Sequence, residues 1–295
     1  MKWNIKTRAQ SLFTLFTALA FAFAASFSVT TVASETVAMI TDLTGNVSIT
    51  SNGVEKEGEI LMSISPGDEV RVKANSKLTL VYFKSAKEYT FPEKSVIKIN
   101  TETPENKSGS KVASRNLEVA KNAKLLSVDG EYSQAAIVFR SARKKPRIKL
   151  IRPINSRVLD TQPSFEWEPL EEVSEYRFVL IDDSGRTVIE TLVNGTSYNL
   201  PSENKIVDYV LYTWRVEARL ATGDVYTNST SFSLLDDEER GKINRLRPKD
   251  DATFSERLVF AMLLEQMGVR DEAYRYWNIL SAEKPDNKLL QGKAK

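Results

Sequence analysis

The chain has 295 residues, no cysteine and no histidine, and it carries 41 Lys and Arg residues against 39 Asp and Glu residues. The lack of cysteine excludes disulfides, thiol nucleophiles and thiolate metal sites, and the lack of histidine excludes a Ser-His-Asp triad and His-ligated metals. An enzyme of this composition would have to rely on carboxylates, Lys, Tyr or Ser, and the length predicts about two or three domains.

The first 34 residues have the composition of a secretory signal peptide. Lys2, Lys6 and Arg8 make the start basic, the residues from Ser11 to Val29 are mostly apolar, and small residues lead up to Ser34. A basic, then an apolar, then a small-residue region predicts export followed by cleavage. An uncleaved inner-membrane anchor is the alternative, because nineteen mostly apolar residues can just span a bilayer.

Removal of this segment would change the charge balance. It carries three basic residues and no acidic ones, so the remaining chain has 38 basic and 39 acidic residues and a formal charge of −1. Such a chain has no overall positive field to attract nucleic acid. Export without cysteine suits a bacterial periplasm, where folding then needs no oxidation. We therefore expect a periplasmic protein without a nucleic-acid partner.

Residues 35–105 have the pattern of short β-strands separated by turns. Apolar segments recur about every eight to twelve residues, without a helical period. Between them stand turn signals such as Asn52-Gly53 and the run from Ser65 to Asp68. Asn-Gly is a strong hairpin signal because both residues tolerate positive φ. The pattern predicts a small antiparallel β barrel or sandwich.

The run from Val37 to Asn100 resembles the FecR-like periplasmic β domain. The segments that match are Leu43-Thr44-Gly45, Pro66-Gly67-Asp68, Ser76 to Leu80 and Ser95 to Ile99. The resemblance implies a domain that lies outside the inner membrane and contacts protein partners. The best-known members also carry a cytoplasmic anti-sigma segment, whereas here ten residues precede the apolar stretch, so we do not expect direct control of a sigma factor.

Residues 106–147 are predicted to be a helical and basic connector. Apolar residues from Lys111 to Leu126 lie mainly along one helical face, which predicts a helix. The basic run from Arg140 to Arg152 follows. We interpret it as a solvated linker, and the alternative is a patch for anionic lipid, anionic glycan or nucleic acid. The candidate partner-binding residues of this run are Arg140, Arg143, Lys144, Lys145 and Arg147.

In residues 148–235, apolar and polar residues alternate as they do in the strands of a β-sandwich of the immunoglobulin or fibronectin III kind. The runs from Ser164 to Trp167, Tyr176 to Ile181 and Leu211 to Ala218 place every second apolar residue on one face. About seven strands in so few residues fit this architecture, and the pattern resembles bacterial extracytoplasmic fibronectin III-like modules.

Three aromatic residues of this region allow two interpretations. Trp167, Tyr212 and Trp214 could form an exposed platform that stacks on sugars, or they could fill the space between two sheets. Tryptophans on strands far apart in the sequence usually pack in the core, so we expect core packing.

Residues 236–295 are predicted to be helical. Thr253 or Ser255 can cap a helix that ends at Gly268, and a second helix begins at Asp271 and ends before Pro285. The small, bulky and turn positions resemble a tetratricopeptide repeat. These positions are Ala261, Leu264, Gly268, Ala273, Trp277, Leu280 and Pro285. The sequence does not decide whether residues 112–146 form a second such hairpin. The same spacing occurs there, at Ala123, Leu126, Gly130, Ala135, Phe139 and Ala142.

A single helical hairpin cannot bury both of its faces alone. We therefore expect the C-terminal hairpin either to dock on the sandwich or to bind a protein partner. Tyr274 and Trp277 are its candidate partner-binding residues.

The sequence as a whole predicts a mainly β protein with α-helices: a small antiparallel barrel or sandwich, an immunoglobulin- or fibronectin III-like sandwich and a C-terminal α-hairpin. The carboxylate pairs are sequence neighbours, which does not indicate two acids facing each other across a cleft, and we expect no catalytic, cofactor or metal site. The function we expect is a non-enzymatic envelope adaptor or signalling accessory that binds an envelope or inner-membrane protein and no small-molecule substrate. The alternatives are a glycan- or peptidoglycan-binding module and, less favoured, a carboxylate-based enzyme.

Overall fold

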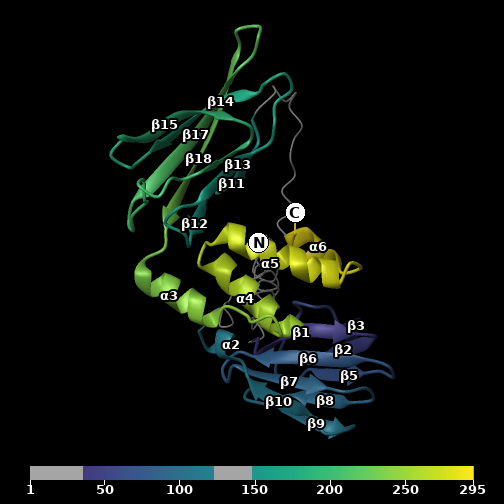
Figure 1. The fold of residues 1–295 in the computed structure, drawn as a ribbon. Coiled ribbons are helices and arrows are strands. Elements are labelled where there is room, and N and C mark those ends of the chain that lie inside the picture. Colours follow the sequence, from purple (N-terminus) through teal and green to yellow (C-terminus); the bar gives the residue numbers. More distant parts are fainter. Residues whose placement is uncertain (1–35, 123–147, 295) are drawn as a thin grey trace, which may run out of the picture. The chain divides into compact units, whose positions relative to one another are not determined.

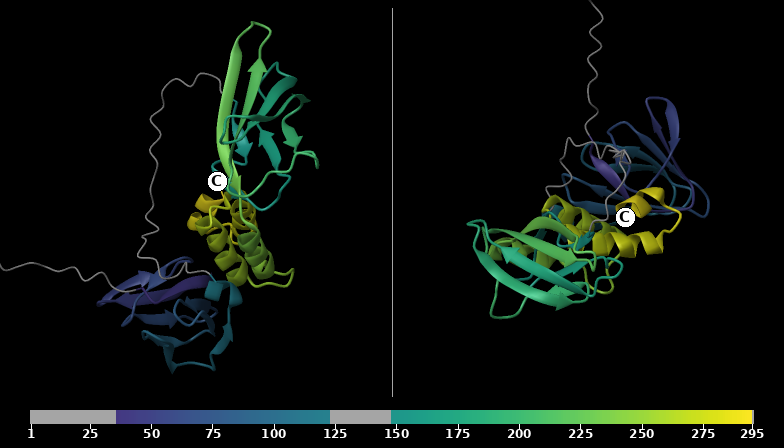
Figure 2. Two further views of the ribbon diagram at one scale, coloured as in Figure 1. Left: turned by 90° about the vertical axis from the view of Figure 1, so that its left-hand side faces the viewer. Right: turned by 90° about the horizontal axis from the view of Figure 1, so that it is seen from above.

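The computed structural model describes residues 36–122 and 148–294 (Figures 1 and 2). It confirms the predicted fold class, because the described residues form several antiparallel sheets followed by helices at the C-terminal end. The described residues belong to one compact unit. Among the described residues, no helix combines the length and the hydrophobicity that a membrane-spanning helix needs.

The N-terminal β domain is a sandwich of two five-stranded sheets with the orders β10-β7-β6-β1-β4 and β3-β2-β5-β8-β9. Apolar side chains from both sheets, among them Ile40, Leu80 and Ile97, form one buried cluster. The strands are β1 (Ala38–Thr44), β2 (Val47–Ser51), β3 (Val54–Glu57), β4 (Ser63–Ile64), β5 (Glu69–Val72), β6 (Lys77–Tyr82), β7 (Lys87–Phe91), β8 (Val96–Ile99), β9 (Pro104–Ser108) and β10 (Ala113–Asn116).

The turns of this domain form where the sequence predicts them. Asn52 and Gly53, between β2 and β3, have φ angles of 51° and 79°. The Asp68 carboxylate accepts a hydrogen bond of 2.9 Å from the backbone N–H of Ser65. This bond closes the Ser65–Asp68 turn, as expected for an Asp side chain that caps its own turn.

The helix predicted from Lys111 begins only at Glu118, as the short helix α2 (Glu118–Asn122). Residues Ala113–Asn116 instead form β10, which pairs with β7, and Arg115 forms an ion pair with the buried Glu88 of β7. This pairing satisfies the backbone of a segment whose own side chains are all exposed. The β domain therefore extends past residue 105, and the rest of the predicted helix and of the second hairpin lies outside the described residues.

Residues 148–235 form a second sandwich, with a three-stranded sheet β11-β13-β16 and a five-stranded sheet β12-β18-β17-β14-β15. β12 and β18 pair in parallel, and the other strand pairs of this sandwich are antiparallel. The strands are β11 (Leu150–Arg152), β12 (Ser156–Val158), β13 (Ser164–Trp167), β14 (Glu175–Ile181), β15 (Thr187–Asn194), β16 (Ser197–Asn199), β17 (Leu211–Arg219) and β18 (Val225–Leu234).

Aromatic rings fill this second sandwich. Trp167, Tyr212 and Trp214 are all buried, which confirms core packing and removes these three residues as a sugar platform. The Phe165 ring centroid lies 5.3 Å from that of Trp214 in an edge-on arrangement. The Trp214 indole N–H donates a 2.8 Å hydrogen bond to the carbonyl of Pro153, so its polar atom is satisfied in the core.

The C-terminal helices are α3 (Asp237–Leu246), α4 (Phe254–Gln266), α5 (Arg270–Glu283) and α6 (Lys288–Lys293). Thr253 caps α4 through a reciprocal capping box with Glu256. Gly268, at φ 76°, separates α4 from α5. The predicted helical hairpin is therefore present, with the cap and the turn at the expected residues.

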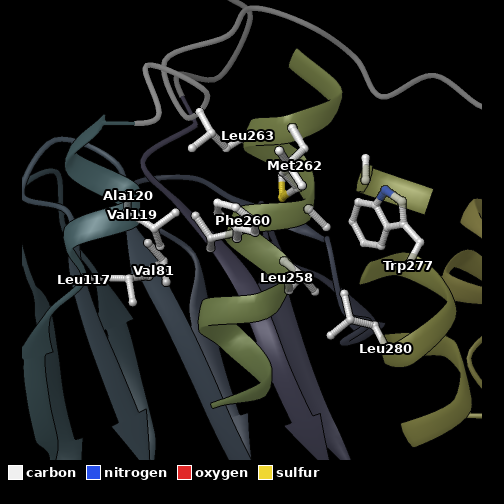
Figure 3. Packing of buried hydrophobic residues seen from close by; sticks show 14 of the residues in the cluster. Val81, Leu117, Val119, Ala120, Leu258, Phe260, Met262, Leu263, Trp277 and Leu280 are labelled. Atoms are coloured by element: carbon white, nitrogen blue, oxygen red, sulfur yellow. The ribbon is translucent and has the colours of Figure 1, made fainter. Parts of the chain in front are cut away.

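The hairpin docks on the N-terminal β domain through a shared apolar core (Figure 3). Residues from β1, β6 and α2 belong to the same buried cluster as α4 and α5. From the sequence, we expected the hairpin to dock on the second sandwich or to bind a protein partner. Its docking on the N-terminal β domain was not predicted. The cluster members labelled in Figure 3 are Val81, Leu117, Val119, Ala120, Leu258, Phe260, Met262, Leu263, Trp277 and Leu280.

Contacts between the C-terminal helices and the second sandwich are mostly polar. Arg157 of β12 pairs through both terminal guanidinium nitrogens with Glu239 of α3, and its backbone N–H donates to the carbonyl of Gly268 at 2.8 Å. The Ser156 hydroxyl accepts a 3.0 Å hydrogen bond from the backbone N–H of Arg270. The apolar contribution includes the buried Leu235 that follows β18.

Candidate partner-binding surface

The structure describes only two of the residues that the sequence marks for partner binding. Tyr274 is 46% exposed on α5, where a partner can reach its ring. The others lie in the basic run outside the described residues, namely Arg140, Arg143, Lys144, Lys145 and Arg147.

Trp277 is not on the surface. It is 1% exposed and belongs to the core that joins α4 and α5 to the β domain. Ala273, one turn before it on α5, is buried in the same cluster. Trp277 therefore stabilises the hairpin from inside and cannot contact a partner while the hairpin is folded, which corrects its assignment as a partner-binding residue.

A cleft of about 330 Å³ lies beside α5, next to the segment that joins α3 to α4. One wall comes from that joining segment and from the start of α4, and the other comes from α5. The cleft-lining residues are Arg247, Pro248, Lys249, Asp250, Arg257, Glu272, Arg275, Tyr276, Ile279 and Glu283. We call this feature the α5 cleft.

Ion pairs hold the walls of the α5 cleft together. Arg247 donates to Glu272 at 2.5 Å, and Arg275 donates to the same carboxylate at 3.2 Å. Arg257 binds Glu283 through two bonds of 2.7 Å from one guanidinium nitrogen. Because Glu272 and Glu283 are engaged in this way, they act as supports for the arginines rather than as free bases.

The α5 cleft has a small excess of positive charge. Its lining contains four cationic side chains and three carboxylates. The exposed Lys249 has no ion-pair partner among the described residues, and the buried Nε of Arg257 has no hydrogen-bond acceptor among them. Arginine presents several fixed donors, so this wall suits a carboxylate-bearing ligand.

Apolar groups complete the lining. Ile279 is 47% exposed at the cleft, although a residue of this kind is usually buried. The Tyr276 ring packs edge-on against Phe260 with centroids 4.9 Å apart. Burial raises the pKa of the Tyr276 hydroxyl above its usual value, and the neighbouring Arg247 guanidinium opposes part of that rise. Tyr276 therefore stays neutral and can donate or accept a hydrogen bond.

Sequence reasoning missed the α5 cleft, although part of its signal is visible. Glu272, Tyr276, Ile279 and Glu283 are spaced at three or four residues along α5 and so share one helix face. This face is distinct from the one that carries Trp277. The opposite wall depends on how the segment around Pro248 folds back, which local periodicity does not predict. In the part of the chain that the structure describes, no group of three or more Asp or Glu residues could hold a metal ion.

Comparison with known proteins gives no family assignment. No family model matches the chain, and no curated protein matches it. CopC from Methylosinus trichosporium OB3b is a similar solved structure, with 12% identity and a TM-score of 0.24 over 30% of this chain and 93% of CopC. The β-1,2-glucanase from Parabacteroides distasonis has 11% identity and a TM-score of 0.21, over 84% of this chain and 49% of the glucanase. Likenesses this weak carry no argument about fold or function.

Proposed function

We propose that the protein is a non-enzymatic, exported envelope protein that acts as a periplasmic adaptor or signalling accessory for another envelope protein. The observation that carries the proposal is the α5 cleft. It combines a positive excess, arginines fixed by ion pairs and an exposed isoleucine, and this combination suits a protein segment better than a reacting small molecule.

The placement of the hairpin supports this proposal. The face of α5 that carries Trp277 is used inside the chain, where it helps to bury α4 against the β domain. The opposite side of α5 keeps the cleft and Ile279 accessible. A hairpin fixed on a β domain in this way offers a preorganised surface, which lowers the ordering cost of binding.

Export and the class of partner rest on the sequence. The first 34 residues have the composition of a signal peptide, and the remaining chain is close to neutral. The resemblance of residues 37–100 to the FecR-like β domain points to a protein partner. The chemistry of the cleft adds that the partner segment carries a carboxylate beside an apolar side chain.

A charge-reversal experiment tests this proposal. The chain from Glu35 to Lys295 is immobilised and exposed to envelope extract, beside a Lys249→Glu/Arg275→Glu variant. A Lys56→Glu/Lys73→Glu variant, altered at two exposed lysines of the β domain, is the control for net charge. We expect one protein to be retained by the unaltered chain and by the control and lost from the cleft variant.

Two results would contradict the proposal. Equal retention of the same proteins by the cleft variant would show that the α5 cleft is not the binding surface. Retention of no protein, together with binding of the chain to purified peptidoglycan, would favour the glycan-binding alternative.

A further inference from the structure

Strand β15 (Thr187–Asn194) stands at the border of the five-stranded sheet of the second sandwich (Figure 1). It pairs with β14, and no other strand of the described residues pairs with it. The outer side of β15 therefore carries a row of backbone N–H and C=O groups that another strand can bind.

Strand β15 is the longest border strand of the described sheets, and its register against β14 shifts only near its start, between Thr187 and Ile189. The other border strands have two to five residues, whereas β15 has eight. Several of them also contain Lys, Arg or Pro, such as Lys56 in β3 and Pro104 in β9, and β15 contains none of these residues. Proteins block unwanted strand pairing with short strands, Lys and Pro, so a long border strand without them is suited to pairing.

We propose that two copies of this protein associate through β15, in an antiparallel pair about a twofold axis, with Thr191 of one copy opposite Thr191 of the other. The pair joins the two five-stranded sheets edge to edge. The occupant of the border is a second copy because the β15 sequence complements itself in this register.

The register follows from the faces of the strand. Ile189, Thr191 and Val193 lie on the core side, because they pair with Leu180, Phe178 and Tyr176 of β14. A twofold axis perpendicular to the sheet keeps the core sides of both copies on one face, and it requires one residue to lie opposite itself. With Thr191 at the axis, Ile189 of one copy faces Val193 of the other, within the regular part of β15 that follows the register shift near Val188.

The neighbouring registers are worse. With Glu190 at the axis, two carboxylates of like charge lie directly opposite each other, which destabilises the pair. With Leu192 at the axis, Val193 lies opposite Thr191, and no β15 residue lies opposite Ile189.

Charge also fits the Thr191 register. Arg177 of β14 lies beside Leu192 and forms an ion pair of 2.7 Å with Glu190. In the proposed dimer, Glu190 lies opposite Leu192 of the second copy, one strand away from the Arg177 of that copy. The solvent side of the junction thus holds an arginine and a glutamate on either side of Leu192, and Leu192, which is 63% exposed in the single chain, lies diagonally from Leu192 of the second copy.

The lack of native cysteine gives a direct test of the register. A Thr191→Cys variant of the chain from Glu35 to Lys295 places two thiols opposite each other, with Cα atoms about 5 Å apart. In a Leu192→Cys variant the same atoms are offset along the strand and lie about 8 Å apart, beyond the reach of a disulfide. We expect oxidation to give a reducible dimer with Thr191→Cys and only monomer with Leu192→Cys. Monomer from both variants, or cross-linking through Leu192→Cys instead, would overturn the proposal.

Light scattering and sedimentation test association without a cross-link. We expect the unaltered chain to form a concentration-dependent dimer. Leu192→Glu puts a carboxylate opposite Glu190 and should weaken the dimer on the order of tenfold, and adding Glu190→Lys in the same chain should restore it. Unchanged circular dichroism would show that the variants are folded. A chain that stays monomeric at every concentration, or a dimer that Leu192→Glu leaves intact, would overturn the proposal.

Discussion

The C-terminal helices meet the two β regions of the molecule in different ways. Against the N-terminal β domain they bury apolar side chains such as Phe260 and Leu263, together with Val81 and Leu117 (Figure 3). Against the second sandwich they make mainly hydrogen bonds and ion pairs, of which Arg157 with Glu239 is one. One junction is thus a shared core, and the other is largely polar.

This difference predicts how the parts depend on one another. An apolar junction loses its stabilisation when its parts separate, because the buried surface becomes exposed to water. The groups of a polar junction can exchange their protein partners for water, so their net contribution is small. We therefore expect the β domain and the helices to unfold as one unit, and the second sandwich to depend less on them.

The largest effect should come from the shared core. Leu258→Ala removes a buried side chain of α4 and should lower the free energy of unfolding by about 2–5 kcal/mol. Leu211→Ala, the same change at an exposed site of β17, is the matched control and should cost less than about 1 kcal/mol. Urea unfolding followed by circular dichroism measures both, and equal costs would refute a shared core.

An intermediate effect is expected at the polar junction, where Asp271 lies in the first turn of α5. Burial raises the pKa of the Asp271 carboxyl to about 6, and the negative charge of Glu166 adds to this rise. The positive charges of Arg152 and Arg270 and a hydrogen bond with Ser156 lower the pKa in part. The folded state therefore binds this proton more tightly than the unfolded state, so stability is lost as pH rises from about 4 to 6.

Replacement of Asp271 removes that pH dependence. Relative to the unaltered chain, Asp271→Asn should gain stability between pH 4 and pH 7, by about 3 kcal/mol at most. Unfolding measured in urea at a series of pH values gives this difference. A difference that stays constant from pH 4 to pH 7 would show that burial of Asp271 does not cost stability at this junction.

The smallest effect should come from the ion pair at the same junction. Both side chains of the Arg157–Glu239 pair are about one-third exposed, so Glu239→Gln should cost about 0.5 kcal/mol. Salt screens partly exposed charges, and the cost should shrink in about 1 M NaCl. The loss of unfolding free energy caused by Leu258→Ala should not shrink with salt in the same way. A loss from Glu239→Gln that does not depend on salt would contradict a polar junction between the helices and the second sandwich.

Sequence patterns predicted the features that local chemistry determines. The Thr253 cap and the Gly268 turn depend on one or two residues and are found as expected. The burial of Trp167 and Trp214 follows from the alternation of their strands.

Features set by distant contacts were not predicted. Strand β10 has only exposed side chains, so its sequence carries no apolar period, and its conformation depends on pairing with β7. Helix α4 is apolar on nearly all sides, which indicates burial without naming the surface that buries it. The α5 cleft combines Lys249 and Glu283, whose proximity depends on the packing of α4 against α5.

Hydrogen exchange of a shortened chain tests the shared core most directly. The chain from Glu35 to Lys295 is compared with one that ends at Leu235 and lacks all four C-terminal helices, and amide exchange is followed by mass spectrometry in β6 and β14. We predict that β6 loses protection because Val81 becomes exposed, while β14 keeps its protection inside an intact aromatic core. Full protection of β6 in the shortened chain would contradict a core shared between the β domain and the C-terminal helices.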